Sequence, residues 1–336
     1  MRGIDEQRLA GWMAAEAIAV TPPVEVHPLS GDRSDGAFWV GDAAGRAWVL
    51  RRPPQRRATP TIEDLARAHR ILAVLAGRGV PVPAPVAFCR DEAVASAPFS
   101  LAEFVDGHVL AGPGDAARLG PDGRRRAAES LVDALVALHA VDVDANGLGD
   151  LAPRQGHTAR QLELWHHSVL AGHDGARRCL LLVHDLHDYL AARLPPEPRR
   201  PAIVHGDYRL DTAVFADDGQ VRAVLHWEGA TLGDPLADLA DLMVYWPDPG
   251  AHDEPPGTSP FPTRHEIARR YADRSGLDLE HLDFFVGFAY WKMACGLEGV
   301  YARERVDGRV GPDQLDAVTH HVLGLAESAR ATLGGP

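Results

Sequence analysis

The chain is short of lysine, cysteine and long hydrophobic runs. Lys292 is the single lysine among 336 residues, so a task that needs a cation elsewhere must fall to arginine. Cys89, Cys179 and Cys295 are odd in number and far apart, which favours buried structural thiols over a disulfide framework or a zinc knuckle. No apolar run approaches the roughly 18 to 20 residues of a membrane span, and no signal-peptide pattern follows Met1. We therefore expect a cytoplasmic protein without a membrane partner.

The charge balance is acidic, with 47 Asp and Glu residues against 34 Lys and Arg, a formal net charge of -13. A polyanion would not be attracted over long range, so we expect no nucleic-acid partner. The hydrophobic fraction of 46% and the charged fraction of 24% are ordinary for a globular protein whose length suits two lobes. A small molecule is the expected ligand, and nothing demands more than a monomer or a weak homodimer.

The first third of the chain mixes helical and strand patterns. Apolar residues at helical spacing predict helices over 5–18 and 61–76. Short runs rich in β-branched and aromatic residues, separated by turn residues, predict an antiparallel sheet. Its strands are expected at 24–29, 37–40, 47–50, 84–88 and 99–104. Residues 1–106 are thus predicted to form a small α+β lobe.

The remainder, 107–336, is predicted to be mainly helical. A stretch rich in Gly, Pro and Asp over 107–123 forms the expected connection. Helices are predicted at 124–140, 157–171, 177–193, 235–245, 263–275, 279–303 and 311–333. Short strands are predicted at 202–204, 213–215 and 221–225, on either side of a turn at 217–219.

The segment 203–228 carries the most informative motif. It contains HGDYRLDTAVF at 205–215 and VLHWE at 224–228. In this order, these and five further motifs resemble the aminoglycoside phosphotransferase / choline kinase-like superfamily, closest to its phosphotransferase enzyme branch related to acyl-CoA dehydrogenase fusions. The further motifs are LSGDRS at 29–34, VLRRPP at 49–54, EFVDG at 103–107, GDPLADLA at 233–240 and GVYAR at 299–303. The resemblance implies an α+β, protein-kinase-like two-lobed fold.

The resemblance also implies site residues. Asp207 falls on the catalytic aspartate, which accepts the proton of the substrate hydroxyl in phosphoryl transfer. Thr212 stands where the family has a magnesium-binding asparagine, and His226 stands where it has a magnesium-binding aspartate. An imidazole is a poor ligand for hard, oxygen-seeking Mg²⁺. Both metal positions are therefore degenerate, and we expect no metal.

The first lobe also departs from the family at residues that bind the nucleotide. Arg51 and Ser34 are the expected nucleotide-binding residues, if nucleotide binding is retained. Arg51 takes the usual lysine position, but its expected glutamate partner on the helix is replaced by Ala68. Rescue by Glu63 or Asp64 is less favoured because they lie a turn or more earlier on the helix. We expect no cofactor, with ATP and Mg²⁺ as the alternative.

Three functions remain open. The favoured one is an ATP- and Mg²⁺-independent enzyme of secondary metabolism whose acid/base chemistry, of lyase, dehydratase, cyclase or isomerase type, uses Asp207 and His226. The alternatives are a residual small-molecule O-phosphotransferase and a non-catalytic ligand-binding protein of pseudokinase type. A softer ion such as Zn²⁺ at His226, Asp207 and Glu228 is a weaker hypothesis.

Aromatic residues are expected to border the acceptor pocket, which would suit a hydrophobic or ring-bearing substrate. The predicted substrate-binding residues are Glu228, Tyr208, Trp165, Tyr290 and Trp291. Core packing is an equal alternative for Trp291 and is favoured for Trp227.

Two other pairs are predicted to be structural. Asp234 and Asp238 should brace the catalytic loop and cap a helix. His166 and His167 point about 100° apart on a helix, so they should be solvent-exposed and not a chelating pair.

Overall fold

The computed structural model describes residues 4–29, 36–53, 60–170, 178–247, 261–306 and 312–334. Ser34 lies outside the described residues, so its predicted role in nucleotide binding stays a prediction. The chain divides into two compact units. The first, here the sheet unit, draws on the ranges Met1–Leu138, Leu210–Ala230 and Asp248–Thr263. The second, here the helical unit, draws on His139–Arg209, Thr231–Pro247 and Arg264–Pro336.

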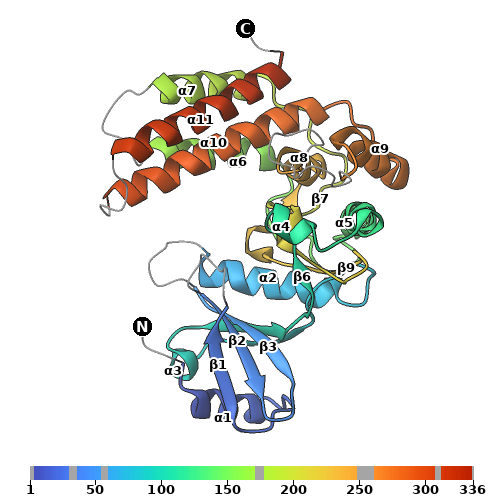
Figure 1. The fold of residues 1–336 in the computed structure, drawn as a ribbon, viewed down its shortest axis with the longest axis vertical. Helices are drawn as coiled ribbons and strands as arrows, with labels where there is room; N and C mark the ends of the chain where they lie inside the picture. The colour runs from blue at the N-terminus through green and yellow to red at the C-terminus, as the bar shows by residue number, and fades with distance from the viewer. Residues whose placement is uncertain are drawn as a thin grey trace. The chain divides into compact units, whose positions relative to one another are not determined.

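The sheet unit is built on a five-stranded antiparallel sheet in the order β1-β2-β3-β5-β4 (Figure 1). Its strands are β1 (Val24–Pro28), β2 (Ala37–Asp42), β3 (Ala47–Arg51), β4 (Pro85–Cys89) and β5 (Phe99–Glu103). All five were predicted. Alternate residues of β3 are buried, Trp48 and Leu50 among them, and they pack in one core with Phe99 and Leu101 of β5. This period of two is what a half-buried strand requires.

Helices α1 (Glu6–Ala15), α2 (Ile62–Leu75) and the short α3 (Glu92–Ala95) accompany this sheet. The start of α2 is fixed by a capping box: the Thr61 hydroxyl accepts from the Asp64 N–H, and the Asp64 carboxylate accepts from the Thr61 N–H. Such boxes satisfy two of the free N–H groups at a helix start. Leu65, Ala68, Ile71 and Leu75 form the buried face of α2.

The sheet unit does not end at the predicted boundary of 106/107. It also takes in β6 (His108–Val109), α4 (Pro113–Ala116), most of α5 (Pro121–His139), β8 (Ala213–Phe215) and β9 (Val221–Val224). Strands β6, β8 and β9 form a three-stranded antiparallel sheet. Ser130 of α5 donates to the Gly219 carbonyl at 3.2 Å and accepts from the Val221 N–H at 3.1 Å. These contacts attach the β8–β9 turn to α5, which explains why the segment belongs to this unit.

The helical unit is dominated by helices (Figure 1). They are α6 (His157–Leu170), α7 (Arg178–Ala191), α8 (Leu236–Val244), α9 (Arg264–Ser275), α10 (Leu282–Val306) and α11 (Pro312–Thr332). Helices α6, α7, α10 and α11 share one core. Helix α10 packs against α11, α6, α7 and α8. A small antiparallel pair, β7 (Ala202–Val204) with β10 (Thr231–Gly233), completes the unit. The protein is thus a mixed α and β structure with a sheet-based and a helical part, as the sequence predicted.

The cysteines described with their side chains, Cys89 and Cys295, are free and buried, as predicted. Burial raises the pKa of both thiols, so they are inert. The Cys179 side chain lies outside the described part of the chain. Among the described residues, no helix has the length and apolar content needed to cross a membrane.

Candidate functional site

Arg51, the last residue of β3, contacts two residues of the predicted site in the sheet unit. Its Nη1 donates to Glu228 Oε1 at 2.5 Å, and its Nη2 lies 3.1 Å from His226 Nδ1. Both side chains of the Arg51–Glu228 ion pair are largely buried, at 22% and 14% exposure. The cation at the lysine position therefore has a carboxylate partner, which comes from the segment after β9 and not from α2.

The Arg51 contact defines the protonation of His226. A guanidinium has donors and no acceptor, so the His226 Nδ1 that it approaches must accept. The imidazole is then neutral and carries its proton on Nε2. His226 also has left-handed backbone angles, φ 64° and ψ 53°, which place it at the start of the short 3₁₀ turn η2 (Trp227–Gly229). A strained residue of this kind is frequent at functional sites.

A second arginine holds the same turn from α2. Arg67 Nε donates to the Ala230 carbonyl at 2.9 Å, and its Nη2 donates to the Glu228 carbonyl at 3.0 Å. Asp64 Oδ1 lies 2.7 Å from Arg67 Nη2, and this ion pair holds the Arg67 side chain in place. Ala68, which replaces the family glutamate, is buried in the apolar face of α2. The helix thus positions the site through Arg67 and backbone oxygens instead of through a carboxylate at position 68.

The ionised state of Glu228 is favoured by this arrangement. Burial raises the pKa of Glu228, but the charge of Arg51 and the hydrogen bonds to the carboxylate outweigh it and hold the pKa below its ordinary value. The carboxylate is therefore committed to Arg51 at neutral pH. Glu228 was predicted to bind substrate; in the structure it orients Arg51.

Thr212 and His226, the two positions predicted to have lost their metal ligands, lie on neighbouring segments of the chain. The Leu225 N–H donates to the Thr212 carbonyl at 2.7 Å, so Thr212 lies beside the residue that precedes His226. Thr212 is buried, at 2% exposure. His226 Nδ1 faces the Arg51 cation, which would repel a second cation at this nitrogen. A buried hydroxyl and an imidazole beside a guanidinium do not match the oxygen ligands that Mg²⁺ requires, so these two residues do not fit a magnesium-bound nucleotide.

Asp207 belongs to the helical unit, in a loop that is braced by Asp238. The Asp238 carboxylate accepts from the His205 N–H at 2.6 Å and from the Gly206 N–H at 2.8 Å. His139 Nε2 lies 3.3 Å from the same carboxylate. Asp238 is fully buried, and burial raises its pKa, but His139, His205 and the Gly206 N–H outweigh this and lower it. The predicted bracing role of Asp238 is confirmed.

Asp234 caps a helix, as predicted: its Oδ1 accepts from the Leu236 N–H at 2.9 Å at the start of α8. Asp207 itself is 48% exposed and has Arg209 Nε at 3.1 Å from its Oδ1. It is therefore an accessible carboxylate on a rigidly held backbone.

A buried ion pair stands behind this loop. Lys292 Nζ on α10 lies 2.5 Å from Asp241 Oδ2 on α8 and donates to the Gly206 carbonyl at 3.3 Å. Burial and the nearby carboxylates of Asp238 and Asp207 raise the pKa of Asp241 to about 6, with Lys292 opposing them. The single lysine of the chain thus supports the catalytic-loop backbone in the helical unit.

The predicted aromatic wall is only partly accessible. Tyr208 and Trp291 are 1% and 0% exposed, and the Trp291 indole donates to the Val183 carbonyl at 2.9 Å inside the helical core. This placement favours core packing for both residues. Trp165 is partly buried against the same core, and the Tyr290 hydroxyl accepts from Arg264 at 2.6 Å. Trp227 is buried and bonded to the Val224 carbonyl, as expected for core packing.

The two predicted catalytic residues are described in different units, Asp207 in the helical unit and His226 in the sheet unit. Their pairing on one substrate is not a contact within either unit and stays a prediction. Within the sheet unit the structure brings together Arg51, His226 and Glu228. Sequence reasoning missed this arrangement, since 177 residues separate Arg51 from Glu228.

The prediction for His166 was wrong. Its ring is half-buried and stacks on His187 of α7, with ring centroids 3.8 Å apart, and it bonds to His184 at 2.7 Å. His167 is 72% exposed, as expected. The signal that could have revealed this cluster is the spacing of the histidines on α7 at 184 and 187, one helical turn apart.

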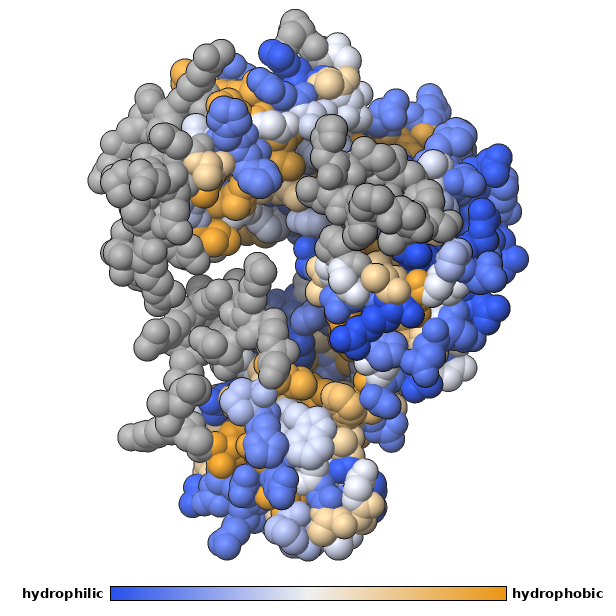
Figure 2. All heavy atoms as spheres, viewed as in Figure 1, coloured by the Kyte–Doolittle hydropathy of each residue, from blue (hydrophilic) through white to orange (hydrophobic). Residues whose placement is uncertain are grey.

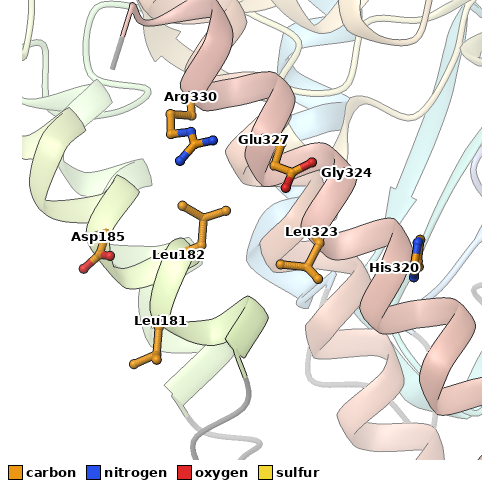
Figure 3. A pocket seen from close by; sticks show the side chains of 8 residues that line it. All are labelled: Leu181, Leu182, Asp185, His320, Leu323, Gly324, Glu327 and Arg330. Atoms are coloured by element: carbon orange, nitrogen blue, oxygen red, sulfur yellow. The ribbon is translucent and has the colours of Figure 1, made fainter. Parts of the chain in front are cut away.

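A surface pocket of about 520 Å³ lies in the helical unit between α7 and α11 (Figure 3). Leu182 of α7 and Leu323 of α11 extend into the gap between the two helices. Exposed hydrophobic residues occur on the same unit, Leu181 at 57% and Leu164 at 60%, and Figure 2 shows orange hydrophobic atoms at its surface among blue hydrophilic ones. No predicted site residue lines this pocket, so it is distinct from the candidate site.

The fold and these residues define a class of protein. Residues 25–281 match the family model described as the phosphotransferase enzyme family. The chain belongs to this family.

Its relatives include much longer proteins. It is 30% identical over 307 residues to acyl-CoA dehydrogenase family member 10 of Mus musculus, covering 89% of this chain and 28% of the relative. It is 31% identical over 293 residues to acyl-CoA dehydrogenase family member 11 of Gallus gallus, covering 83% of this chain and 37% of the relative. The chain thus spans about a third of the length of these curated relatives, within the fusion-type branch of the family.

Solved structures agree with this placement. A protein of Ralstonia eutropha named as a candidate aminoglycoside phosphotransferase superposes with a TM-score of 0.80 at 28% identity, covering 98% of both chains. The GDP complex of an aminoglycoside 2'-phosphotransferase-IIIa mutant superposes with a TM-score of 0.61 at 18% identity, covering 98% of this chain and 99% of that one. A macrolide 2'-phosphotransferase of Brachybacterium faecium superposes with a TM-score of 0.57 at 20% identity, covering 98% of both chains. The last two establish the shared fold alone.

Proposed function

We propose that this member of the phosphotransferase enzyme family is an ATP- and Mg²⁺-independent enzyme that acts on a small molecule by acid/base chemistry. The observation that carries the proposal is the position of Arg51, whose guanidinium is bound by Glu228 and His226. A cation that is held by a carboxylate and an imidazole is less available for a triphosphate. Phosphoryl transfer depends on such cations and on metal ions for almost all of its acceleration.

His226 is the proposed proton donor. Its Nδ1 accepts from Arg51, so its proton is on Nε2 and its tautomer is defined. Glu228 fixes Arg51 in turn, at 2.5 Å. A defined tautomer held by a second residue is what a histidine needs in order to donate to one side of a substrate.

Asp207 is the proposed base. Its carboxylate is 48% exposed, and Asp238 holds the backbone on which it lies. In the family this residue accepts a proton from a hydroxyl, and that step needs neither nucleotide nor metal. Together with a proton donor, such a base would support elimination of water, cyclisation or isomerisation.

The names of the structural neighbours support the proposed substrate class. The solved neighbours are phosphotransferases named for aminoglycosides and macrolides, which are hydroxylated ring compounds. We infer that this chain binds a hydroxylated, ring-bearing small molecule. In the curated relatives the matching region is joined to other parts of a longer protein, so a product could pass to a second activity.

The test is a product assay under three conditions. The purified chain is incubated with a panel of hydroxylated ring compounds, including aminoglycosides and macrolides, with EDTA, with Mg²⁺ alone, and with Mg²⁺ and ATP. Mass spectrometry distinguishes isomerisation or loss of water from addition of phosphate. We expect the same unphosphorylated product in all three conditions. A product that forms only with Mg²⁺ and ATP and carries a phosphate would refute the proposal.

Variants assign the roles. Asp207→Asn and His226→Gln should each lower turnover by about 100-fold or more, the range expected for a lost general acid or base. Glu25→Gln, a change at an exposed carboxylate of β1, should leave turnover unchanged. Full activity in either catalytic variant, with normal circular dichroism, would eliminate that residue from the mechanism. A bound compound that is never converted would indicate a ligand-binding protein instead.

A residual O-phosphotransferase is the second candidate, and the retained catalytic-loop aspartate favours it. Asp207 and its brace Asp238 are both present. This candidate requires that ATP or GTP with Mg²⁺ raises the melting temperature of the wild-type chain. We expect no shift for the wild type and a measurable shift for the double variant Thr212→Asn with His226→Asp, which restores both family metal ligands. A shift in the wild type equal to that in the double variant would favour the phosphotransferase.

A further inference from the structure

Two neighbouring helices of the helical unit carry matched pairs of metal-binding residue types. Helix α6 has Glu163 and His166, and α7 has His184 and His187. Residues three apart lie on the same face of a helix, one turn from each other. The two faces meet, because His166 contacts both His184 and His187.

The ligand atoms are close enough to share one ion. One donor atom each of Glu163, His166 and His187 lie within 4.8 Å of one another. His187 Nε2 is 3.4 Å from Glu163 Oε1. Two ligands of a tetrahedral zinc ion, each at about 2.0 to 2.1 Å, are about 3.3 Å apart. The distance between His187 Nε2 and Glu163 Oε1 therefore fits two ligands of one first-row divalent ion.

His187 provides an independent indication of a ligand. The residue is 8% exposed, and its Nδ1 lies 3.0 Å from Asp188 Oδ1. A carboxylate accepts from Nδ1–H, which leaves a lone pair on Nε2. Nε2 is buried and makes no hydrogen bond to any described residue, because its contact with Glu163 Oε1 at 3.4 Å lacks hydrogen-bond geometry. A buried polar atom of this kind requires an explanation, and a carboxylate on the far nitrogen of a histidine is the usual support of a metal ligand.

His166 is held in a similar way. One of its ring nitrogens, Nε2, lies 2.7 Å from His184 Nδ1, and its ring stacks on His187 at an interplanar angle of 14°.

We propose that Glu163, His166 and His187 form a binding site for a divalent transition-metal ion of the Zn²⁺ class. Asp188 and His184 orient the two histidines. Two imidazoles and one carboxylate are a ligand set for zinc, with a fourth position left for water. Glu163 is 57% exposed, so the site opens to solvent on its side. Because two nearly parallel ring planes cannot both contain one ion, binding opens the His166–His187 stack.

The site would link α6 to α7 at the edge of the helical core. His187 packs near Trp291 of α10, with ring centroids 6.1 Å apart. An ion bound only to the folded unit stabilises it in proportion to its concentration. The site is separate from Asp207 and His226 and does not depend on the proposed function.

Metal binding is measured on the full chain after dialysis against EDTA. Calorimetric titration with ZnCl₂ should give one site per chain, and Co²⁺ should give the visible absorption of a four-coordinate ion. His187→Gln and Glu163→Gln should each weaken Zn²⁺ binding at least about tenfold, and Asp188→Asn should weaken it by about tenfold. Circular dichroism verifies that each variant is folded; Glu163 is exposed enough to tolerate its change if His187 does not.

The matched control is His27→Ala, which removes an exposed histidine 3.6 Å from Glu25 on β1. It should leave Zn²⁺ affinity unchanged. The proposal is overturned if the wild type binds Zn²⁺ no more tightly than Glu163→Gln does, or if His27→Ala causes an equal loss. Unchanged product formation in these variants would leave the acid/base proposal intact, since the two sites share no residue.

Discussion

Arg51 Nη1 lies 2.5 Å from Glu228 Oε1, although 177 residues separate them in the chain. The relationship replaces the ion pair between a strand lysine and a helix glutamate that kinase-like phosphotransferases use. Its carboxylate comes from the turn that contains the degenerate metal position, His226. Arg51 therefore links the missing helix glutamate to the replacement at His226, because its guanidinium contacts the Glu228 carboxylate and the His226 imidazole at once.

The Arg51–Glu228 ion pair should make a measurable contribution to stability. Glu228→Gln removes the charge and leaves a partly buried guanidinium without its counterion. We expect the free energy of unfolding to fall by about 1 to 3 kcal/mol, less than for a fully buried pair because Arg51 keeps some contact with solvent. Urea denaturation measures the loss.

A double-mutant cycle with Arg51→Met isolates the pairwise energy. The two changes together should cost less than the sum of their separate effects, as expected for residues in direct contact. Glu25→Gln, at a carboxylate with 68% exposure, should change the free energy of unfolding by no more than about 0.5 kcal/mol. Additive effects of the Arg51 and Glu228 changes would show that the ion pair contributes nothing.

The sequence predicted the elements better than the contacts between them. Period-two burial in β3 and the capping box of α2 are local signals, and both elements lie where they were expected. Strands β6, with the sequence His-Val, and β10, Thr-Leu-Gly, were missed because they lack the apolar runs that indicated the equally short β7 and β8. Their existence depends on pairing with β8 and β7, which is decided by the tertiary fold.

The same limit applies to the site. Ala68 correctly indicated that α2 lacks the family carboxylate, but no local pattern shows that Glu228 pairs with Arg51 instead. The sequence predicted a solvent-exposed His166 because its partners on α7 are 18 and 21 positions away. The family motif located Asp207, and the burial of Tyr208 and Trp291 could not be read from it.

Asp238→Asn should loosen the loop that carries Asp207. The wild-type carboxylate accepts from two backbone N–H groups and is fully buried. An amide has one acceptor oxygen, so one N–H group would face an NH₂ group. We expect a loss of about 2 to 4 kcal/mol in the free energy of unfolding. Amide hydrogen exchange at 205 and 206 should accelerate in parallel, and unchanged exchange there would contradict the bracing role.

Asp241 should impose a pH dependence on stability. Its pKa is about 6 in the folded chain against an ordinary value of 3.8, so the folded state holds the proton more firmly than the unfolded state. The contribution of Asp241 to stability is therefore greatest below about pH 4 and declines as the pH rises through 6. Melting temperatures between pH 4 and 7 should show this decline in the wild type. It should be absent in Asp241→Asn, and identical profiles for the two proteins would exclude Asp241 as its cause.

Gly219 should be the most sensitive glycine of the β8–β9 turn. Its φ of +90° is a backbone conformation that L side chains rarely adopt, and a Cβ there would overlap the Gly123 carbonyl oxygen of α5. Because backbone atoms cannot move aside cheaply, Gly219→Ala should lower the free energy of unfolding by about 3 kcal/mol or more. Gly45→Ala is the matched control: its φ is +80°, but a Cβ there meets nothing within 4 Å, so only the backbone strain of about 1 kcal/mol applies. Urea denaturation of the two variants separates the terms, and equal losses would show that the packing of the turn against α5 does not hold the segment 210–230 in the sheet unit.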